Sequence, residues 1–124
     1  MYTGEYRKAI SIFESSKPVL GIGIDNFILG HAAVAYYKTG LKDFTEKFLN
    51  VIKLRSEKSP VGSPSYYIAI IYTSMGENDK AIQWLQKAYK DHEVEMYWLN
   101  VDPLYIPLHN DPRFKDLLSK IGFK

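Results

Sequence analysis

Histidine, cysteine and glycine patterns show whether this chain has the side chains for metal or phosphate chemistry. The three histidines are His31, His92 and His109, and none has a second histidine one helical turn away beside a carboxylate, the spacing typical of metal ligands. The absence of cysteine excludes disulfides, thiolate ligands and thiol nucleophiles together. Gly21 and Gly23 form a G-x-G, but a third glycine and a preceding strand are lacking, which argues against a phosphate-binding loop. The sequence therefore predicts no metal site and no cofactor.

Two aspartates have the chemistry to act as a general acid and a general base. Asp102 and Asp111 each directly precede a proline, however, and Asp-Pro is a strong helix-start signal. The carboxylate caps the helix N-terminus, and the proline presets φ for the first helical residue. Capping explains both aspartates without catalysis, and no G-x-S-x-G sequence is present to place a nucleophilic serine. We therefore expect no catalytic residue and classify the chain as a non-enzyme.

The composition is that of one ordinary globular domain. Of its 124 residues, 46% are hydrophobic and 24% are charged, which suffices for a real core. The net charge of +2 is too small to indicate nucleic acid or a membrane surface as the partner. No apolar run is long enough to cross a membrane, and no signal peptide is visible, so we expect a cytoplasmic protein. The ten tyrosines are an excess that suits either a contact surface or packing between helices.

A repeat with a period of 36 residues organises the chain. Gly4, Gly40 and Gly76 are evenly spaced, 36 residues apart. Each glycine is followed after five residues by a small side chain and after nine residues by a large apolar one, namely Ala9 and Phe13, Thr45 and Leu49, Ala81 and Leu85. A fixed period of this length indicates an array of helix pairs, and such arrays usually serve as surfaces that hold other proteins.

Helix signals recur along the chain, and no segment has the alternation of a strand. Apolar residues at helical spacing predict a first helix that ends before Pro18 and later helices at about 26–39, 42–55, 64–75, 79–91 and 113–121, with a short helix at 93–99. We expect Asp25 and Ser63 to cap the helices that follow them. Gly40 suits the left-handed position that ends a helix. The short connections predict an all-α fold of antiparallel neighbours.

The residues of these helix pairs resemble the tetratricopeptide repeat (TPR) family. The family's small residue, Tyr, Gly, Ala, large apolar residue and Ala are matched in order by Ala69, Tyr72, Gly76, Ala81, Leu85 and Ala88. The preceding repeat matches less fully, with Ala33, Tyr36, Gly40, Thr45, Leu49 and Ile52. This chain departs from the family in three ways. Leu29 and Ser65 stand where the family has Trp, Glu57 and Glu93 stand where it has Pro, and the period is 36 rather than about 34.

The resemblance implies a single TPR-like domain over residues 1–124. We expect a right-handed array of antiparallel helix pairs, an α-α superhelix, divided into 1–17 (second helix of a partial repeat), 25–57 (repeat), 63–92 (repeat) and 93–124 (C-terminal capping segment). From Gly62 to Phe123 the chain resembles the closing end of bacterial TPR arrays, which are often fused behind a regulatory domain. That narrower resemblance implies the tail of a longer protein.

The family register also implies a binding groove on the concave face, lined by the first helix of each pair. The residues placed there are Phe27, Val34, Tyr37, Lys38, Tyr66, Tyr67, Ile70, Thr73 and Ser74. Such a surface suits an extended peptide or an amphipathic helix of a partner protein. Gly30, Val34, Ser63 and Tyr67 stand where one TPR subtype has a Lys and Asn clamp for a C-terminal carboxylate, so chaperone-tail binding is disfavoured.

Two functions therefore remain open. The first is a non-catalytic protein-protein interaction module, or scaffold, with a protein or peptide partner. The alternative is a regulatory or sensory C-terminal segment of a larger signalling or transcription-regulating protein. Neither function needs a nucleic acid or a membrane as a direct partner.

The first helix raises a separate question of association. Its apolar stripe of Tyr6, Ile10 and Phe13 has no first-helix partner in the sequence. An exposed stripe of this kind invites contact with another surface, so we expect a weak homodimer through the N-terminal helix, or association with sequence upstream in a longer protein. Another outcome is that residues 17–24 fold back and cover the stripe with Val19, Leu20 and Ile22.

Overall fold

The computed structural model describes residues 7–8, 11 and 25–122, and within them every regular element is helical. The α-helices are α2 (Asn26–Lys38), α3 (Lys42–Lys58), α4 (Pro64–Ser74), α5 (Asn78–Lys90) and α6 (Pro112–Ile121). Two 3-10 helices, η2 (Val94–Trp98) and η3 (Pro103–Leu108), lie between α5 and α6. The predicted all-α class is confirmed.

Most of the first predicted helix lies outside the described residues. Arg7, Lys8 and Ser11 are helical, as the sequence predicts for this segment. The stripe of Tyr6, Ile10 and Phe13 and the segment 17–24 lie outside the described part of the chain. The proposed dimer face and the fold-back cover therefore both remain predictions.

Helix ends follow the local signals in the sequence at most positions. Gly40 and Gly76 have φ values of +89° and +77°, the left-handed conformation that glycine adopts most easily. Asp25 caps α2, because its carboxylate accepts a hydrogen bond of 2.9 Å from the backbone N–H of Ile28. Asp111 does the same for α6, accepting from the N–H of Arg113 at 2.9 Å, so its predicted role as a cap is confirmed.

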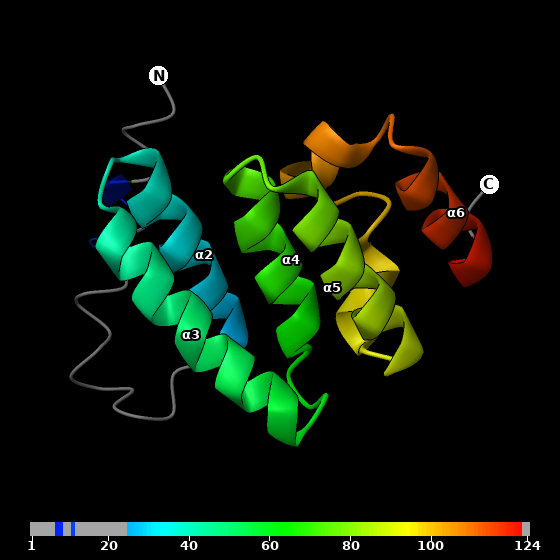
Figure 1. Cartoon of the computed structure of the whole chain (residues 1–124), viewed down its shortest axis with the longest axis horizontal. Helices are drawn as coiled ribbons and strands as arrows, with labels where there is room; N and C mark the ends of the chain where they lie inside the picture. Colours follow the sequence, from blue (N-terminus) through cyan, green and yellow to red (C-terminus); the bar gives the residue numbers. More distant parts are fainter. Residues whose placement is uncertain (1–6, 9–10, 12–24, 123–124) are drawn as a thin grey trace.

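Two antiparallel helix pairs, α2 with α3 and α4 with α5, lie side by side, and α6 packs against α5 at the end of the row (Figure 1). The sequence period reappears as a contact offset. The Asn26 side chain donates to the carbonyl of Gly62 at 3.1 Å, and Lys38 Nζ donates to the carbonyl of Ser74 at 3.4 Å. Both bonds join residues 36 apart, one at each end of α2. Helices α2 and α4 therefore run parallel with a register of one repeat.

Helix α4 is the centre of the molecule. Every residue from Pro64 to Thr73 is buried, and the helix contacts α2, α3, α5 and η3. A helix that is apolar on all sides belongs in a core rather than at a surface. Gly30 allows α2 to approach it closely, because a Cβ at that position would lie 3.1 Å from the Tyr67 ring.

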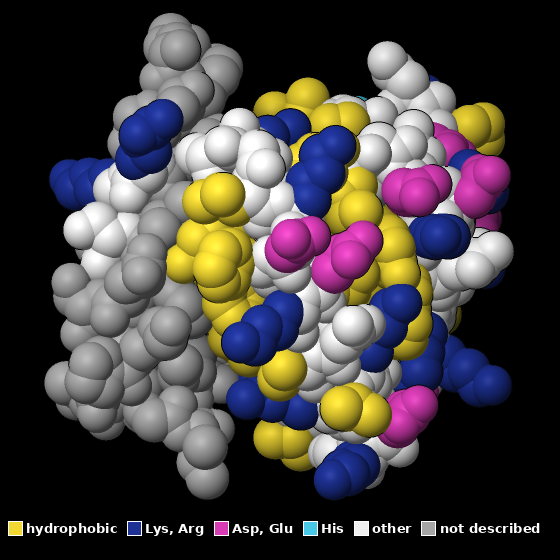
Figure 2. All heavy atoms as spheres, turned by 60° about the vertical axis from the view of Figure 1, so that its left-hand side comes forward, with side chains coloured by type: hydrophobic (Ala, Val, Ile, Leu, Met, Phe, Trp, Pro, Cys, Tyr) yellow, Lys and Arg dark blue, Asp and Glu magenta, His cyan; other side chains and the backbone are white. Residues whose placement is uncertain are grey.

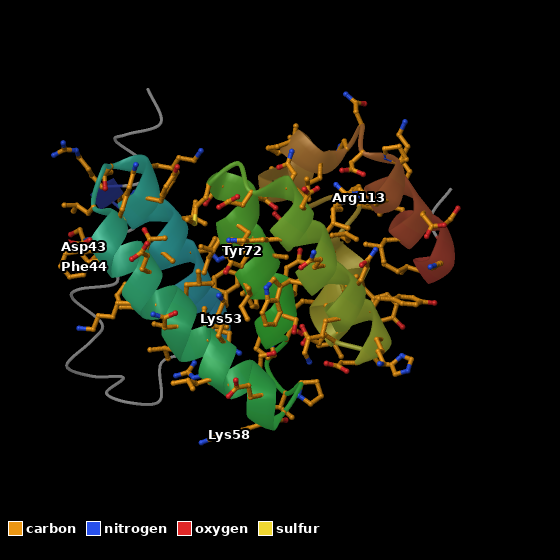
Figure 3. The ribbon with its side chains drawn as sticks, viewed as in Figure 1. Asp43, Phe44, Lys53, Lys58, Tyr72 and Arg113 are labelled. Atoms are coloured by element: carbon orange, nitrogen blue, oxygen red, sulfur yellow. The ribbon has the colours of Figure 1, made fainter. Side chains whose placement is uncertain are left out.

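Helices α3, α5 and α6 are amphipathic and contain charged residues of both signs, and Lys, Arg, Asp and Glu side chains alternate on the face shown in Figure 2. Lys53 of α3 lies over the ring of Tyr72 in α4, with its Nζ 5.1 Å from the ring centre (Figure 3). Among the described residues no helix combines the length and the apolar character that crossing a membrane requires.

Candidate functional site

The N-terminus of α4 is built by a residue far along the chain. Ser63 precedes the helix, but it adopts a left-handed conformation (φ 52°) and makes no side-chain cap. Glu93 takes that role instead: its carboxylate accepts from the N–H groups of Ser65 at 3.2 Å and Tyr66 at 2.9 Å. The expectation that Ser63 caps α4 is therefore wrong. The Ser63 hydroxyl accepts from the N–H of Glu95 and so fixes the start of η2 against the start of α4.

Burial of Glu93 has an electrostatic consequence. Only 4% of this residue is exposed, and the loss of hydration raises the pKa of its carboxyl. The two backbone N–H donors act in the opposite direction and stabilise the charged form. The carboxylate therefore bridges α4 and η2 in an environment that opposes its charge.

Tyr66 connects α4 to the segment that follows η2. Its hydroxyl donates to Asp102 Oδ2 at 2.5 Å, and Tyr105 donates its own hydroxyl to the Tyr66 carbonyl at 2.6 Å. Burial, first, and the bond to Asp102, second, raise the pKa of the Tyr66 hydroxyl, so it remains a donor at neutral pH. Asp102 also caps η3 by accepting from the N–H of Leu104 at 3.0 Å, which confirms its predicted capping role.

Tyr67 makes a parallel connection one residue later. Its hydroxyl donates to Glu95 Oε2 at 3.0 Å, and burial, followed by this bond, raises the pKa of the hydroxyl. The rings of Tyr66 and Tyr67 meet edge to face with their centres 5.2 Å apart. Two adjacent tyrosines of a buried helix thus hold two carboxylates, Glu95 and Asp102, in fixed positions.

An open hollow of about 310 Å³ lies where these groups meet. Its walls come from the first turns of α2 and α4, from η2 and from the start of η3, and they consist of Phe27, His31, Tyr66, Tyr67, Glu95, Trp98, Val101, Asp102 and Pro103. Three of these are large apolar side chains that remain exposed: Phe27 (55%), Trp98 (59%) and Val101 (65%). We call this site the aromatic hollow.

A second hollow of about 180 Å³ shares Phe27, Tyr67 and Glu95 with the aromatic hollow. Its other lining residues are Asp25, Asn26, Gly62, Ser63 and Val94. The shared residues place the two hollows next to each other at the starts of α2 and α4. We call this second hollow the side hollow.

The residues that the family register placed in a groove separate into three groups in the structure. Phe27, Tyr66 and Tyr67 line the aromatic hollow. Val34, Ile70 and Thr73 are buried at 2%, 0% and 3% exposure, and the Thr73 hydroxyl donates to the carbonyl of Ala69 inside α4. The structure therefore places these three in the core between the helices.

The remaining groove residues lie at the C-terminal ends of α2 and α4. Tyr37 is half-buried, and Lys42 Nζ lies 5.6 Å from the centre of its ring. Lys38 is exposed and reaches the carbonyl of Ser74 near the C-terminus of α4, where a positive charge is favourable. Ser74 directs its hydroxyl to the carbonyl of Ile71. Aromatic side chains with carboxylates thus lie at the N-terminal ends of α2 and α4, and lysines lie at their C-terminal ends.

The three histidines lie on different elements. His31 Nδ1 donates to the carbonyl of Phe27 at 2.8 Å, and its ring lies 4.3 Å from that of Phe27. His109 stacks on Phe114, and its buried Nε2 has no hydrogen-bond partner among the described residues. The described residues contain no cluster of three or more His, Asp or Glu side chains that could hold a metal ion.

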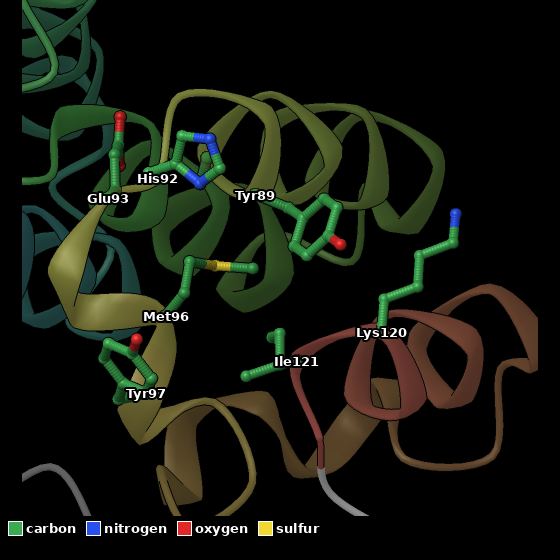
Figure 4. A pocket seen from close by; sticks show the side chains of 8 residues that line it. Tyr89, His92, Glu93, Met96, Tyr97, Lys120 and Ile121 are labelled. Carbon is green, nitrogen blue, oxygen red and sulfur yellow. The ribbon is translucent and has the colours of Figure 1, made fainter.

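His92 lines another hollow, of about 210 Å³, between α5, η2 and α6. Tyr89, Met96 and Ile121 reach into its space from these three elements (Figure 4). In the described part of the chain, the charged residues that line it are Glu93, which caps α4, and Lys120, which is exposed. Its lining therefore mixes apolar side chains with polar ones.

Sequence reasoning did not identify Glu95, Trp98 and Val101 as site residues, and it assigned Asp102 only a capping role. A signal was nevertheless present, because Tyr66 and Asp102 are separated by 36 residues, one repeat. One repeat onward from the start of α4, the chain enters the segment of η2 and η3. That segment supplies Glu95, Trp98, Val101, Asp102 and Pro103 to the wall of the hollow.

Comparisons of the chain with protein families, with curated proteins and with solved structures find no match.

Proposed function

We propose that this chain is a TPR-like helical array that acts as a non-catalytic interaction module and binds a peptide or helix of a partner protein. The parallel first helices α2 and α4, offset by one repeat of 36 residues, support the TPR-like arrangement. The TPR-like residue order in the two helix pairs supports it as well.

The single observation that carries this proposal is the aromatic hollow. Exposed Phe27 and Trp98 stand beside Tyr67, whose ring is fixed by burial and by its bond to Glu95. Rigid aromatic side chains in a concave site are the groups that carry most of the binding energy in protein interfaces. The volume of about 310 Å³ matches one or two side chains of a partner rather than a large cofactor.

Selection from a random library of displayed peptides tests the proposal. The unmodified chain should select peptides, and Trp98→Ala should weaken their binding about 30-fold or more on the scale of interface hot spots. Ile106→Ala is the matched control, because Ile106 is 60% exposed, as Trp98 is 59% exposed, but does not line either hollow. Selected peptides that bind both variants equally would contradict the proposal.

A further inference from the structure

The charges around the aromatic hollow are unbalanced. Glu95 and Asp102 line it, and Asp25 lines the side hollow next to it. No lysine or arginine lines either hollow within the described residues. Among the described residues, Arg55 is the cation that contacts a lining residue, donating to Asn26 Oδ1 at 2.8 Å. The lining of the aromatic hollow and the side hollow therefore carries a negative charge, although the chain carries a net charge of +2.

The two carboxylates of the aromatic hollow have acceptor positions left for a ligand. A carboxylate has about four lone-pair positions. Glu95 uses one for the Tyr67 hydroxyl, while Asp102 uses one for the Tyr66 hydroxyl and one for the N–H of Leu104. The tyrosine hydroxyls hold the carboxylates in place before a ligand arrives, which reduces the loss of freedom on binding. Both acids are partly exposed and so remain accessible.

We infer that the aromatic hollow receives an arginine side chain from an extended peptide of a partner protein. This inference rests on the proposed function. A guanidinium group is planar, stacks on aromatic faces and binds carboxylates through two parallel hydrogen bonds. Phe27 and Trp98 supply exposed aromatic groups, and Glu95 and Asp102 supply the acceptors. Lysine offers a compact charge without the planar surface, so it should bind more weakly.

Titrations followed by nuclear magnetic resonance test the inference directly. The probes are synthetic peptides of one alanine-serine sequence with a central arginine, lysine, citrulline or glutamate, and the signal is the indole N–H of Trp98. The arginine peptide should shift this signal most, and neutral citrulline, which keeps the planar shape, should bind about fivefold more weakly or worse. Equal binding of the citrulline and arginine peptides, preference for the glutamate peptide, or no shift with the arginine peptide would overturn the inference.

Substitution of one carboxylate separates charge from shape. Glu95→Gln keeps an oxygen acceptor for the Tyr67 hydroxyl and should weaken the arginine peptide about fivefold, with little effect on the citrulline peptide. Glu57→Gln is the control, because Glu57 is exposed and lines neither hollow. If Glu95→Gln does not fold, as judged by its circular dichroism spectrum, Trp98→Ala replaces it, observed through the Tyr67 ring signals, and should weaken the arginine peptide at least fivefold. An unchanged affinity in the folded variant would overturn the inference.

The same set of variants distinguishes failure of the inference from failure of the proposed function. Library peptides that need Trp98 but lack arginine, and bind Glu95→Gln normally, would leave the interaction module intact and reject the arginine pocket. Selected peptides that are indifferent to Trp98 would reject both.

Discussion

Helices α2 and α4 are equivalent in the repeat, yet their N-termini are stabilised in different ways. Asp25, the residue directly before α2, is exposed and caps its own helix. Helix α4 begins after Ser63, whose side chain does not cap it. The N–H groups of Ser65 and Tyr66 instead bond to Glu93, 28 and 27 residues further along the chain. Where a helix start is exposed, as in α2, the residue directly before the helix can cap it. The start of the central helix α4 is buried, and its cap comes from the segment packed over it.

The largest expected effect comes from removing the remote cap. Glu93→Ala leaves the N–H groups of Ser65 and Tyr66 buried without an acceptor, and each such group costs about 1–3 kcal/mol. We expect the free energy of unfolding in urea to fall by about 3 kcal/mol. Glu77→Ala is the control at an exposed position before α5 and should change it by less than about 0.5 kcal/mol. Equal losses in the two variants would show that the remote cap has no special weight.

The second effect tests the other link between α4 and the C-terminal segment. Tyr105 is fully buried and donates to the carbonyl of Tyr66. Tyr105→Phe removes this one bond and keeps the ring, so the free energy of unfolding should decrease by about 1.5 kcal/mol. The midpoint of thermal unfolding provides the measurement. An unchanged midpoint would mean that the contacts of the ring alone hold η3 to α4.

The local caps should have a smaller and more uniform effect. Asp25→Ala removes one side-chain cap, a change that typically costs about 1 kcal/mol, and Asp111→Ala removes an equivalent cap together with the ion pair to Arg113. Asp25→Asn and Asp111→Asn keep the acceptor and should restore most of the stability. A loss at Asp25 as large as the loss at Glu93 would remove the distinction between the two helices.

The dependence of stability on pH should have opposite signs for the remote cap Glu93 and the local cap Asp111. The pKa of Glu93 is raised by burial, so the stability that protonation of this carboxyl adds is complete below the ordinary value of 4.5 and is lost as the pH rises through the raised pKa. The pKa of Asp111 is lowered by its bonds to Arg113, so its contribution is present above 3.8 and is lost as the pH falls. Urea unfolding between pH 4.5 and pH 7 should therefore show a component that decreases with pH and is absent in Glu93→Gln. The same slope in that variant would contradict this assignment.

Most features that the sequence predicted well depend on residues close together in the chain. Asp-Pro at positions 102–103 and 111–112 and the glycines at 40 and 76 determine helix ends through contacts within a few residues. The period of 36 also carried long-range information, because it reappears as the register between α2 and α4.

The features that sequence did not predict depend on packing between distant segments. Ser63-Pro64 has the form of a helix start with a serine cap, but burial of the site under η2 lets Glu93 reach the N–H groups, and Ser63 turns to Glu95 instead. Val34 and Ile70 have the register of groove residues, yet the close approach of the helices encloses them. The aromatic hollow needs Trp98 and Val101, which belong to a segment without the periodic pattern of a repeat.

The remote cap also has a consequence for the order in which this chain is made. A ribosome releases residues from the N-terminus onward, so Pro64–Ser74 emerges before Glu93 has been joined to the chain. Until η2 and η3 follow, the first turn of α4 has neither its carboxylate acceptor nor the Tyr105 hydroxyl that ties it to η3. Arrays whose repeats are independently stable can begin folding at any repeat. We therefore expect the second repeat to become stable during translation only after residues 93–108 have emerged.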